Sequence, residues 1–266
     1  MQLSEYVEKW DSVLFSAYNI TANMKWLYVK KSVKQLVSRN AALNNKHCGE
    51  RCFLVLNGPS IKKYDLSKIT NEQVLCTNFF YRSAVADVVV PNYICWQDAS
   101  VFNSGEGDMI IGEILERFPN ITMIFNLKAY SVNSYYNNIY YTYNKHLPHQ
   151  WGISSKLEEV SSAFSTVAFY AINAAIYMGF KKIYVLGLDF APGAFEHFDD
   201  LGVECTDPTN QEKKVDVCGN YWAYAKAHYE AYALNQYAKT KGIHIVNLNK
   251  KSCIRAFDFG VYEDLF

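Results

Sequence analysis

The sequence predicts an α/β fold, with a Rossmann-like, mostly parallel sheet flanked by helices. Two observations carry this prediction. Short apolar runs of strand type end abruptly in polar or turn-forming residues, as the run at 52–56 does before Asn57. Segments with helical periodicity lie between these runs, and such alternation is typical of parallel βαβ units. With 266 residues, of which 50% are hydrophobic, the chain is long enough for one such domain.

Residues 1–47 show helical periodicity, and we expect them to form a helical extension of a sheet domain that covers 48–266. No acidic residue occurs from Ser12 to Gly49. The basic residues in that stretch are Lys25, Lys30, Lys31, Lys34, Arg39 and Lys46. One interpretation is an amphipathic helix that lies on an anionic membrane surface. The other is a helix that packs on the domain or on a second copy of the chain.

The first strand ends in the turn Asn57-Gly58-Pro59-Ser60. Gly58 allows the backbone to approach a ligand closely, and Pro59 fixes φ. Ser60 is a favourable helix N-cap, and the free N–H groups behind it suit a phosphate. The turn is equally consistent with a strand-to-helix connection that binds nothing.

Two further strands follow, at 73–78 and within 86–96, and both end in polar residues. Asn78 ends the first of them, and Gln97-Asp98 closes the second. Because the carboxyl ends of parallel strands meet at one edge of a sheet, Asn57, Asn78 and Asp98 are predicted to line one crevice. A helix over 108–118 and a strand over 121–125 continue the alternation.

The clearest helix of the chain is predicted over 167–178, with Gly179 as its C-cap. It leads into a buried strand over 183–190 that carries Asp189 towards its carboxyl end. Ser165 and Thr166 open the helix, where their hydroxyls and free N–H groups are placed to hold an anion. Ordinary capping is the alternative.

Two segments are interpreted as lid-like insertions, near 130–151 and 191–220. The first is irregular and rich in tyrosine, which suits a sugar-binding lid or a surface loop with its own aromatic cluster. The second contains His197. A helix rich in tyrosine and alanine follows over 221–240 and contains His228, and the last strand covers 243–249.

Composition and missing motifs exclude several functions. Lys and Arg together number 26, as do Asp and Glu, so no basic field argues for nucleic acid. GxGxxG is missing after the first strand, as are GxxxxGK[ST] and GxSxG. The seven cysteines show no zinc spacing, and we predict no metal site and a reducing, cytoplasmic compartment. Neither a signal peptide nor a bilayer-spanning segment is expected.

Three blocks, at 56–60, 76–81 and 179–190, come in an order that resembles a known family. They are similar to bacterial sialyltransferases of glycosyltransferase family 42 and to the related group typed as domain of unknown function 115. That group includes flagellin glycosyltransferases and pterin diphosphokinase-like proteins. The last strand also looks similar, so the likeness covers much of 50–257. Residues 1–47 have no counterpart in it.

The resemblance implies a single-domain GT-A-like fold that transfers a sialic acid or a related ulosonic acid from a CMP-sugar donor. The implied reaction is inverting and metal-independent, needs no cofactor and uses a histidine as general base. The family's nucleotide-binding positions fall on Asn57, Gly58, Ser60 and Asn78, and its donor-phosphate position on Ser165 and Thr166. With the strand-end residues, the donor-binding set becomes Asn57, Gly58, Pro59, Ser60, Asn78, Asp98, Ser165, Thr166 and Asp189.

This sequence departs from the family pattern in two places. Ala191 stands where the family has the first of two tyrosines that stabilise the leaving phosphate, and His197 falls on the second. A histidine can do the same work on a phosphate. The base should lie before the final helix, where His228 is the nearest residue, although it sits within the predicted helix. His197 is the other candidate base.

The implied acceptor is a bacterial surface glycan or its glycolipid precursor, and the basic extension fits a peripheral enzyme on the inner membrane. Exposed aromatic residues and the same extension also suit a homo-oligomer. Two other functions stay open. One is an ATP- and Mg²⁺-dependent diphosphokinase or phosphotransferase of the related group. The other is a binding module that kept the fold without catalysis, an alternative that Ala191 keeps open.

Overall fold

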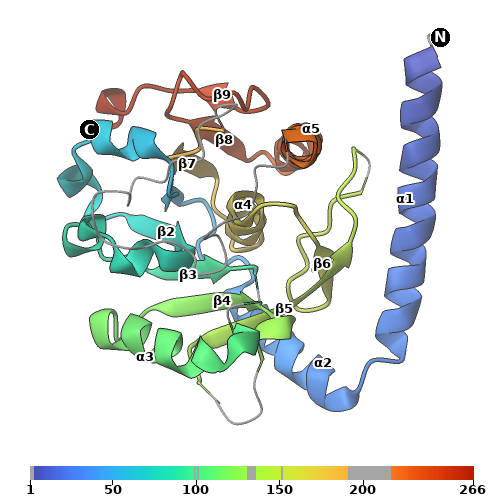
Figure 1. The fold of residues 1–266 in the computed structure, drawn as a ribbon, viewed down its shortest axis with the longest axis horizontal. Coiled ribbons are helices and arrows are strands. Elements are labelled where there is room, and N and C mark those ends of the chain that lie inside the picture. The colour runs from blue at the N-terminus through green and yellow to red at the C-terminus, as the bar shows by residue number, and fades with distance from the viewer. Residues whose placement is uncertain (1–2, 99, 101, 131–135, 151, 191–216) are drawn as a thin grey trace.

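The structure, a computed structural model, describes residues 3–98, 100, 102–130, 136–150, 152–190 and 217–266. Within them, nine strands form one sheet in the order β6-β5-β4-β3-β2-β1-β7-β8-β9 (Figure 1). Every neighbouring pair of these strands runs parallel. The predicted Rossmann-like sheet with flanking helices is therefore confirmed.

The strands are β1 (Arg51–Val55), β2 (Gln73–Thr77), β3 (Tyr93–Trp96), β4 (Thr122–Asn126), β5 (Ile139–His146), β6 (Val160–Ser162), β7 (Lys182–Leu186), β8 (His244–Asn247) and β9 (Asp258–Phe259). The α-helices are α1 (Leu3–Leu27), α2 (Lys31–Ser38), α3 (Gly107–Arg117), α4 (Val167–Tyr177) and α5 (Val217–Thr240). Short 3-10 turns connect several of these elements, among them η2 (Pro59–Lys63) and η5 (Ala84–Asp87).

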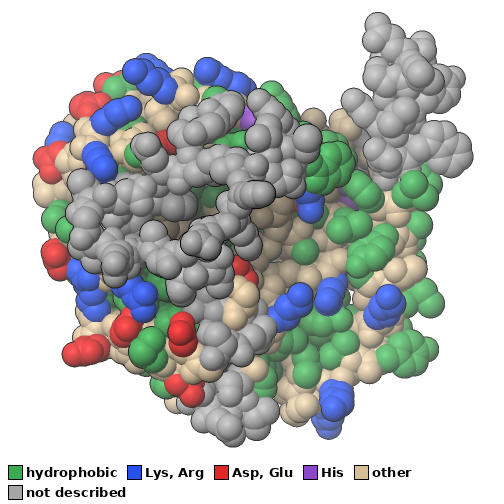
Figure 2. Space-filling model, viewed as in Figure 1, with side chains coloured by type: hydrophobic (Ala, Val, Ile, Leu, Met, Phe, Trp, Pro, Cys, Tyr) green, Lys and Arg blue, Asp and Glu red, His purple; other side chains and the backbone are tan. Residues whose placement is uncertain are grey.

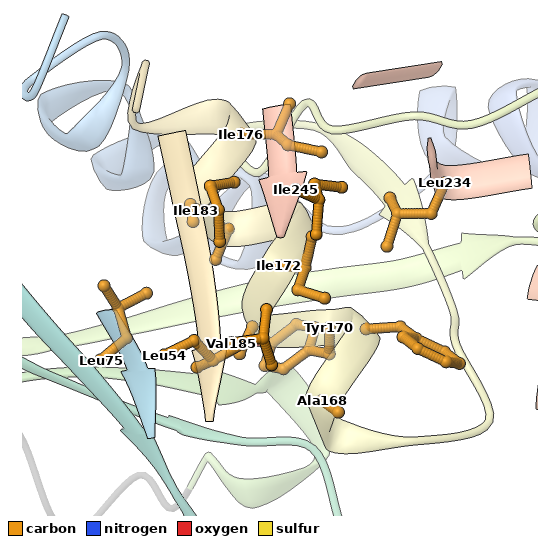
Figure 3. Packing of buried hydrophobic residues seen from close by; sticks show 14 of the residues in the cluster. Leu54, Leu75, Ala168, Tyr170, Ile172, Ile176, Ile183, Val185, Leu234 and Ile245 are labelled. Atoms are coloured by element: carbon orange, nitrogen blue, oxygen red, sulfur yellow. The ribbon is translucent and has the colours of Figure 1, made fainter. Parts of the chain in front are cut away.

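Two apolar layers cover the two faces of the sheet. Side chains alternate along a strand, so Leu54 of β1 joins the layer beneath α4 and α5, whereas Phe53 joins the layer beneath α3. Ten of the eleven residues of α4 are buried, because this helix lies between the sheet and α5. Figure 3 shows the first layer, where Tyr170 and Ile172 of α4 point into the cluster that includes Leu54 and Val185.

The strand order reverses between β1 and β7. The chain builds outward from β1 to β6, returns through α4, and adds β7 to the other edge of β1. In open α/β sheets, ligands bind outside the carboxyl ends of the strands at such a reversal. The turn at 57–60 follows β1, and Asp189 lies three residues beyond the end of β7.

One sequence prediction of local structure was confirmed and another was wrong. The strand expected within 86–96 is Tyr93–Trp96, and it is short because Ala84–Asp87 forms η5 and Pro91 cannot donate a ladder hydrogen bond. Within 130–151, Ile139–His146 is not irregular but forms β5, paired between β4 and β6. The mixed tyrosine, threonine and asparagine pattern of β5 lacks the apolar run of a central strand. Residues 131–135, 151 and 191–216 of the proposed lids lie outside the described residues.

The N-terminal extension is helical, as predicted, but it is not one separate unit. Val37 and Leu43 are fully buried, and the buried Asn40 side chain donates to Tyr141 O at 2.8 Å and to Leu157 O at 2.6 Å. This part of the chain therefore belongs to the main body, and α1 alone stands beside it (Figure 1). Among the described residues, no helix is long and apolar enough to cross a membrane.

Candidate functional site

The carboxylate of Asp189 joins the ends of three strands at the reversal point. It accepts a hydrogen bond from Ser60 N at 2.8 Å, a second from Ser60 Oγ, and a third from Asn249 Nδ2 at 2.7 Å. Ser60 follows β1 and Asn249 follows β8, so one side chain holds β1, β7 and β8 in register at their carboxyl ends. Ser60 was predicted to cap a helix, but Gly58 occupies the N-cap position of η2 and the Ser60 hydroxyl donates to Asp189 instead.

Gly58 is required by close packing of two backbones. Its N–H donates to Gly187 O at 3.1 Å. A Cβ atom at Gly58 would lie 2.2 Å from that oxygen and 2.7 Å from Asp189 Oδ2. Gly58 therefore allows the backbone of the segment after β7 to pass close to the turn that follows β1. Pro59 follows as the first residue of η2, where its missing N–H costs nothing.

Three neighbouring strands carry buried side-chain acceptors without a hydrogen-bond partner among the described residues. They are Asn57 Oδ1 after β1, Asn78 Oδ1 after β2 and Gln97 Oε1 after β3. Buried polar atoms nearly always have a partner, so three unpartnered acceptors on neighbouring strands make this edge a candidate ligand site. Gln97 is held in place because its Nε2 donates to Phe164 O.

The backbone is strained at the same edge. Asn78 has a φ of +49° and Phe190 a φ of +47°, in the left-handed region that non-glycine residues rarely occupy. The Phe190 ring is fixed there by stacking on Phe169, with ring centroids 6.2 Å apart. Such strain persists where the surrounding structure holds it, often at functional sites.

The N-terminus of α4 already holds a carboxylate. Ser165 donates to Glu230 Oε2 through its N–H at 2.8 Å and its hydroxyl at 2.6 Å. Glu230 is 1% exposed, and burial raises the pKa of its carboxyl, while Ser165 and Lys226 partly oppose this shift. Lys226 Nζ lies 3.8 Å from Oε1. Thr166 is the ordinary N-cap of α4, since its Oγ1 accepts from Phe169 N at 3.4 Å.

Both places predicted to bind phosphate are therefore occupied by carboxylates from distant segments. Asp189 takes the N–H and hydroxyl of Ser60, and Glu230 takes those of Ser165. An incoming phosphate at either place would have to share these donors or displace the carboxylate.

The structure places His228 away from the role of a free base. Its Nδ1 lies 2.8 Å from Tyr224 O and its Nε2 2.9 Å from Cys253 O. Both nitrogens thus face acceptors, and a base needs a nitrogen with an open lone pair. His228 thus connects α5 to the backbone at Cys253. The Cys253 N–H in turn donates to Asp189 O at 3.0 Å. The role of His228 as a general base stays a prediction. It requires one ring nitrogen to give up its contact with a backbone carbonyl.

The remaining predicted residues fall at the rim or outside the described chain. Asp98 is exposed, and its Oδ1 accepts from Ser100 N at 2.9 Å in a local turn. His197 and Ala191 lie outside the described residues. In the part of the chain that the structure describes, no group of three or more His, Cys, Asp or Glu side chains is arranged to hold a metal ion.

Sequence reasoning left three residues out of its site: Gln97, Asn249 and Glu230. Gln97 follows a predicted strand and Asn249 ends one, so the rule that selected Asn57 and Asn78 also selects them. Glu230 is the only acidic residue of α5, a helix otherwise rich in alanine and tyrosine. A lone acid in such a helix is a signal, but its partner at Ser165 becomes visible only in the fold.

No model of a known protein family matches the chain, and no curated protein sequence matches it. Among solved structures, the fold is similar to monofunctional α-2,3-sialyltransferase Cst-I from Campylobacter jejuni, with 15% identity and a TM-score of 0.52 over 80% of this chain and 81% of that one. It is also similar to the MAf glycosyltransferase from Magnetospirillum magneticum AMB-1, with 14% identity and a TM-score of 0.51 over 85% of this chain and 38% of that one.

A further similar structure is sialyltransferase CstII from Campylobacter jejuni in complex with CMP-3FNeuAc, with 16% identity and a TM-score of 0.49 over 79% of this chain and 85% of that one. At identities this low, likeness shows a shared fold. The Cst-I and MAf comparisons thus confirm, at the level of fold, the resemblance to sialyltransferases that the sequence blocks predicted.

Proposed function

We propose that this protein is a glycosyltransferase that moves a sialic acid or a related ulosonic acid from a CMP-sugar to a glycan. The observation that carries the proposal is the row of unpartnered acceptors at Asn57, Asn78 and Gln97, beside the reversal of strand order. Amide oxygens bind N–H and O–H donors, and a cytosine amino group and ribose hydroxyls supply both. The fold likeness to a sialyltransferase supports the same assignment.

In this proposal the Asp189 network positions the site and does not react. Its three hydrogen bonds hold the turn after Asn57 against the segment after β7, and the left-handed backbone of Asn78 sets the direction of the second amide. Ser60 and Ser165 then act through their carboxylate partners as supports, and the donor phosphate is bound elsewhere in the crevice.

The proposed chemistry is inverting and independent of metal. The acceptor hydroxyl attacks the anomeric carbon of the donor sugar while the bond from that carbon to the phosphate oxygen of CMP breaks. A histidine takes the hydroxyl proton as the new bond forms. His197 is the stronger candidate for this base, or for stabilising the leaving phosphate, because both ring nitrogens of His228 face backbone carbonyls.

We further propose that the acceptor is a bacterial surface glycan or its lipid-linked precursor. Such an acceptor places the enzyme at the inner face of the cytoplasmic membrane as a peripheral protein, alone or as a homo-oligomer. The long stretch without acidic residues from Ser12 to Gly49 supports this location, because anionic lipids attract lysine-rich segments.

Thermal unfolding with CMP, with and without a chelator, tests the proposal. We expect CMP to raise the melting temperature equally in both conditions, because a ligand that binds only the native state stabilises it. Stabilisation by ATP and Mg²⁺ but not by CMP would instead select the phosphotransferase alternative. Stabilisation by CMP without turnover of any CMP-sugar would select a binding module.

A matched pair of variants locates the nucleotide. Asn78→Gly keeps the left-handed backbone but removes the unpartnered amide, so the CMP shift should vanish. Asn45→Gly is the control, since Asn45 also has a positive φ, +53°, but lies on the loop before β1, away from the carboxyl edge. Equal loss of the CMP shift in both variants would count against the assigned site.

A further inference from the structure

The helix α1 exposes a broad apolar face along most of its described length. Of the fifteen large hydrophobic side chains that are exposed in the described residues, seven lie between positions 13 and 28. They are Val13, Leu14, Tyr18, Ile20, Met24, Leu27 and Tyr28. Figure 1 shows α1 standing beside the sheet, and Figure 2 shows hydrophobic side chains along that side of the molecule. Apolar side chains gathered so densely mark an interaction surface.

The opposite face of α1 is committed to the main body, which fixes the orientation of the helix. Asn19 makes two hydrogen bonds with the backbone of Leu147, donating at 3.1 Å and accepting at 2.8 Å. The Trp26 ring packs on Tyr143 with centroids 5.1 Å apart, and Ala22 is buried. The exposed residues are therefore held outward by specific contacts on the other side of the same helix.

A cluster of lysines lies at the end of this apolar face. Lys25 is the only charged residue between 12 and 28, and Lys30 and Lys31 follow directly where α1 gives way to α2. All three are exposed. Lys34 is drawn to the same end, because its Nζ donates to Leu27 O at 2.9 Å and lies 5.8 Å from the centre of the Trp26 ring. Figure 2 shows basic side chains beside the apolar patch.

We infer that α1 docks in the plane of an anionic lipid bilayer, with the seven exposed hydrophobic residues of 13–28 among the acyl chains and the lysines at the end of the helix at the headgroups. The exposed surface is apolar and basic, so a complementary partner is both apolar and negatively charged. An anionic bilayer has both properties. A second copy of the same face would supply apolar side chains but no acid between residues 12 and 49, since the acids of α1, at positions 5, 8 and 11, come before this stretch.

The geometry favours a helix that lies on the membrane. The exposed stretch from 13 to 28 spans about 24 Å at the α-helical rise, enough for a row of contacts along the surface. The face of α1 that holds Asn19 and Trp26 stays on the protein, so insertion does not require α1 to leave the body. This docking names the surface for the peripheral location proposed above, and it does not depend on the transfer reaction.

Vesicle sedimentation with the full chain tests the docking surface, in the absence of nucleotide so that the result is independent of CMP binding. We expect sedimentation with phosphatidylcholine vesicles that contain phosphatidylglycerol, little with phosphatidylcholine alone, and weaker binding as salt rises. Replacing Lys30 and Lys31 by alanine should lower the partition coefficient roughly fivefold for each lysine at physiological salt.

The double variant Ile20→Glu, Leu27→Glu places charge in the apolar face and should abolish sedimentation. Val90→Glu is the matched control, because Val90 is 64% exposed and Leu27 is 68% exposed, yet Val90 lies far from α1 in sequence, between η5 and β3. Val90→Glu should sediment like the unaltered protein, and all variants should keep its melting temperature.

Three outcomes would overturn the inference. The first is failure of the unaltered chain to sediment with anionic vesicles. The second is equal loss of sedimentation in Val90→Glu. The third is a chain that is dimeric by light scattering, becomes monomeric in the Ile20, Leu27 variant and does not bind vesicles in either form. That result would assign the face to a second copy of the chain.

Discussion

The carboxyl edge of the sheet and the helix α1 differ in the kind of group that each buries or exposes. At the edge, polar groups are buried and held by hydrogen bonds between segments far apart in the chain, such as Ser60, Asp189 and Asn249. In α1, apolar groups are exposed, and the helix contacts the body through one face. The edge depends on the whole fold, whereas α1 can form from its own periodicity and only its orientation depends on the fold. We therefore expect the carboxyl edge to contribute more than α1 to the free energy of unfolding.

The largest effect is expected at the edge, from Gly58→Ala. The new Cβ would meet Gly187 O at 2.2 Å, and this backbone atom cannot move without separating β1 from β7. We expect a loss of more than ~3 kcal/mol in the free energy of unfolding, measured by denaturant titration. Gly112→Ala in α3 is the control, since nothing lies within 4 Å of its added Cβ, and it should gain about 0.5–1 kcal/mol.

Asp189→Asn tests the same carboxyl edge, and the expected loss of stability is smaller than for Gly58→Ala. The amide cannot accept all three hydrogen bonds that the carboxylate accepts, and its NH₂ group would face donors. We expect a loss of roughly 2–3 kcal/mol, because hydrogen bonds to a charged group are among the stronger ones. Asp65→Asn is the control, as the exposed Asp65 carboxylate accepts its hydrogen bonds from nearby Ser67. Equal losses in the two variants would contradict a special role for the Asp189 network.

The junction between α1 and the body should weaken in acid. Burial lowers the pKa of His146 and His149 from 6.5, and for His146 the nearby His149 adds to the effect. Below 6.5 the unfolded chain therefore binds more protons than the native one, so stability rises with pH up to 6.5 and is lost as the pH falls. His146 Nε2 lies 2.8 Å from Asn23 Oδ1, and the His149 ring lies 6.0 Å from Phe15.

Hydrogen exchange, corrected for intrinsic rates, measures this loss. Amides of 12–28 should lose protection as the pH drops below 6.5, while amides of β1 should keep theirs. His146→Gln retains a donor towards Asn23 and should reduce the acid effect. An equal loss of protection in β1 would mean that the two regions unfold together.

The smallest effect is expected from Glu230→Gln. Because burial raises the pKa of Glu230 above 4.5, the native state holds this proton more tightly than the unfolded chain. Stability therefore falls as the pH rises through the window above 4.5, and the ionised group is destabilising at neutral pH. The amide oxygen can still accept from Ser165, so the variant should melt slightly higher at pH 7 and lose this pH dependence. A lower melting temperature would show that the Lys226 ion pair outweighs burial.

Local patterns were enough to predict much of the fold. Helix α4 and strand β7 have their own signals, a small-residue apolar helix with an N-cap at Thr166 and a C-cap glycine before a buried strand. The alternation of such units predicts a parallel sheet, because parallel strands need crossover connections. The strand ends at Asn57 and Asn78 followed from the same pattern. β5 escaped prediction because its tyrosine-rich sequence acquires strand structure through its neighbours β4 and β6.

The sequence by itself determined most of the elements that form, β5 excepted, and which polar residues lie at their ends, because periodicity, capping and turn chemistry act over a few residues. Only the tertiary structure decided the partners of those residues. It paired Ser60 with Asp189 across 129 positions and Ser165 with Glu230 across 65, and it left the buried amide oxygens of Asn57, Asn78 and Gln97 without a hydrogen-bond partner among the described residues. It also decided which face of α1 meets the body and which faces outward. A hydrogen bond between distant segments depends on how whole elements pack, and no local pattern encodes that arrangement.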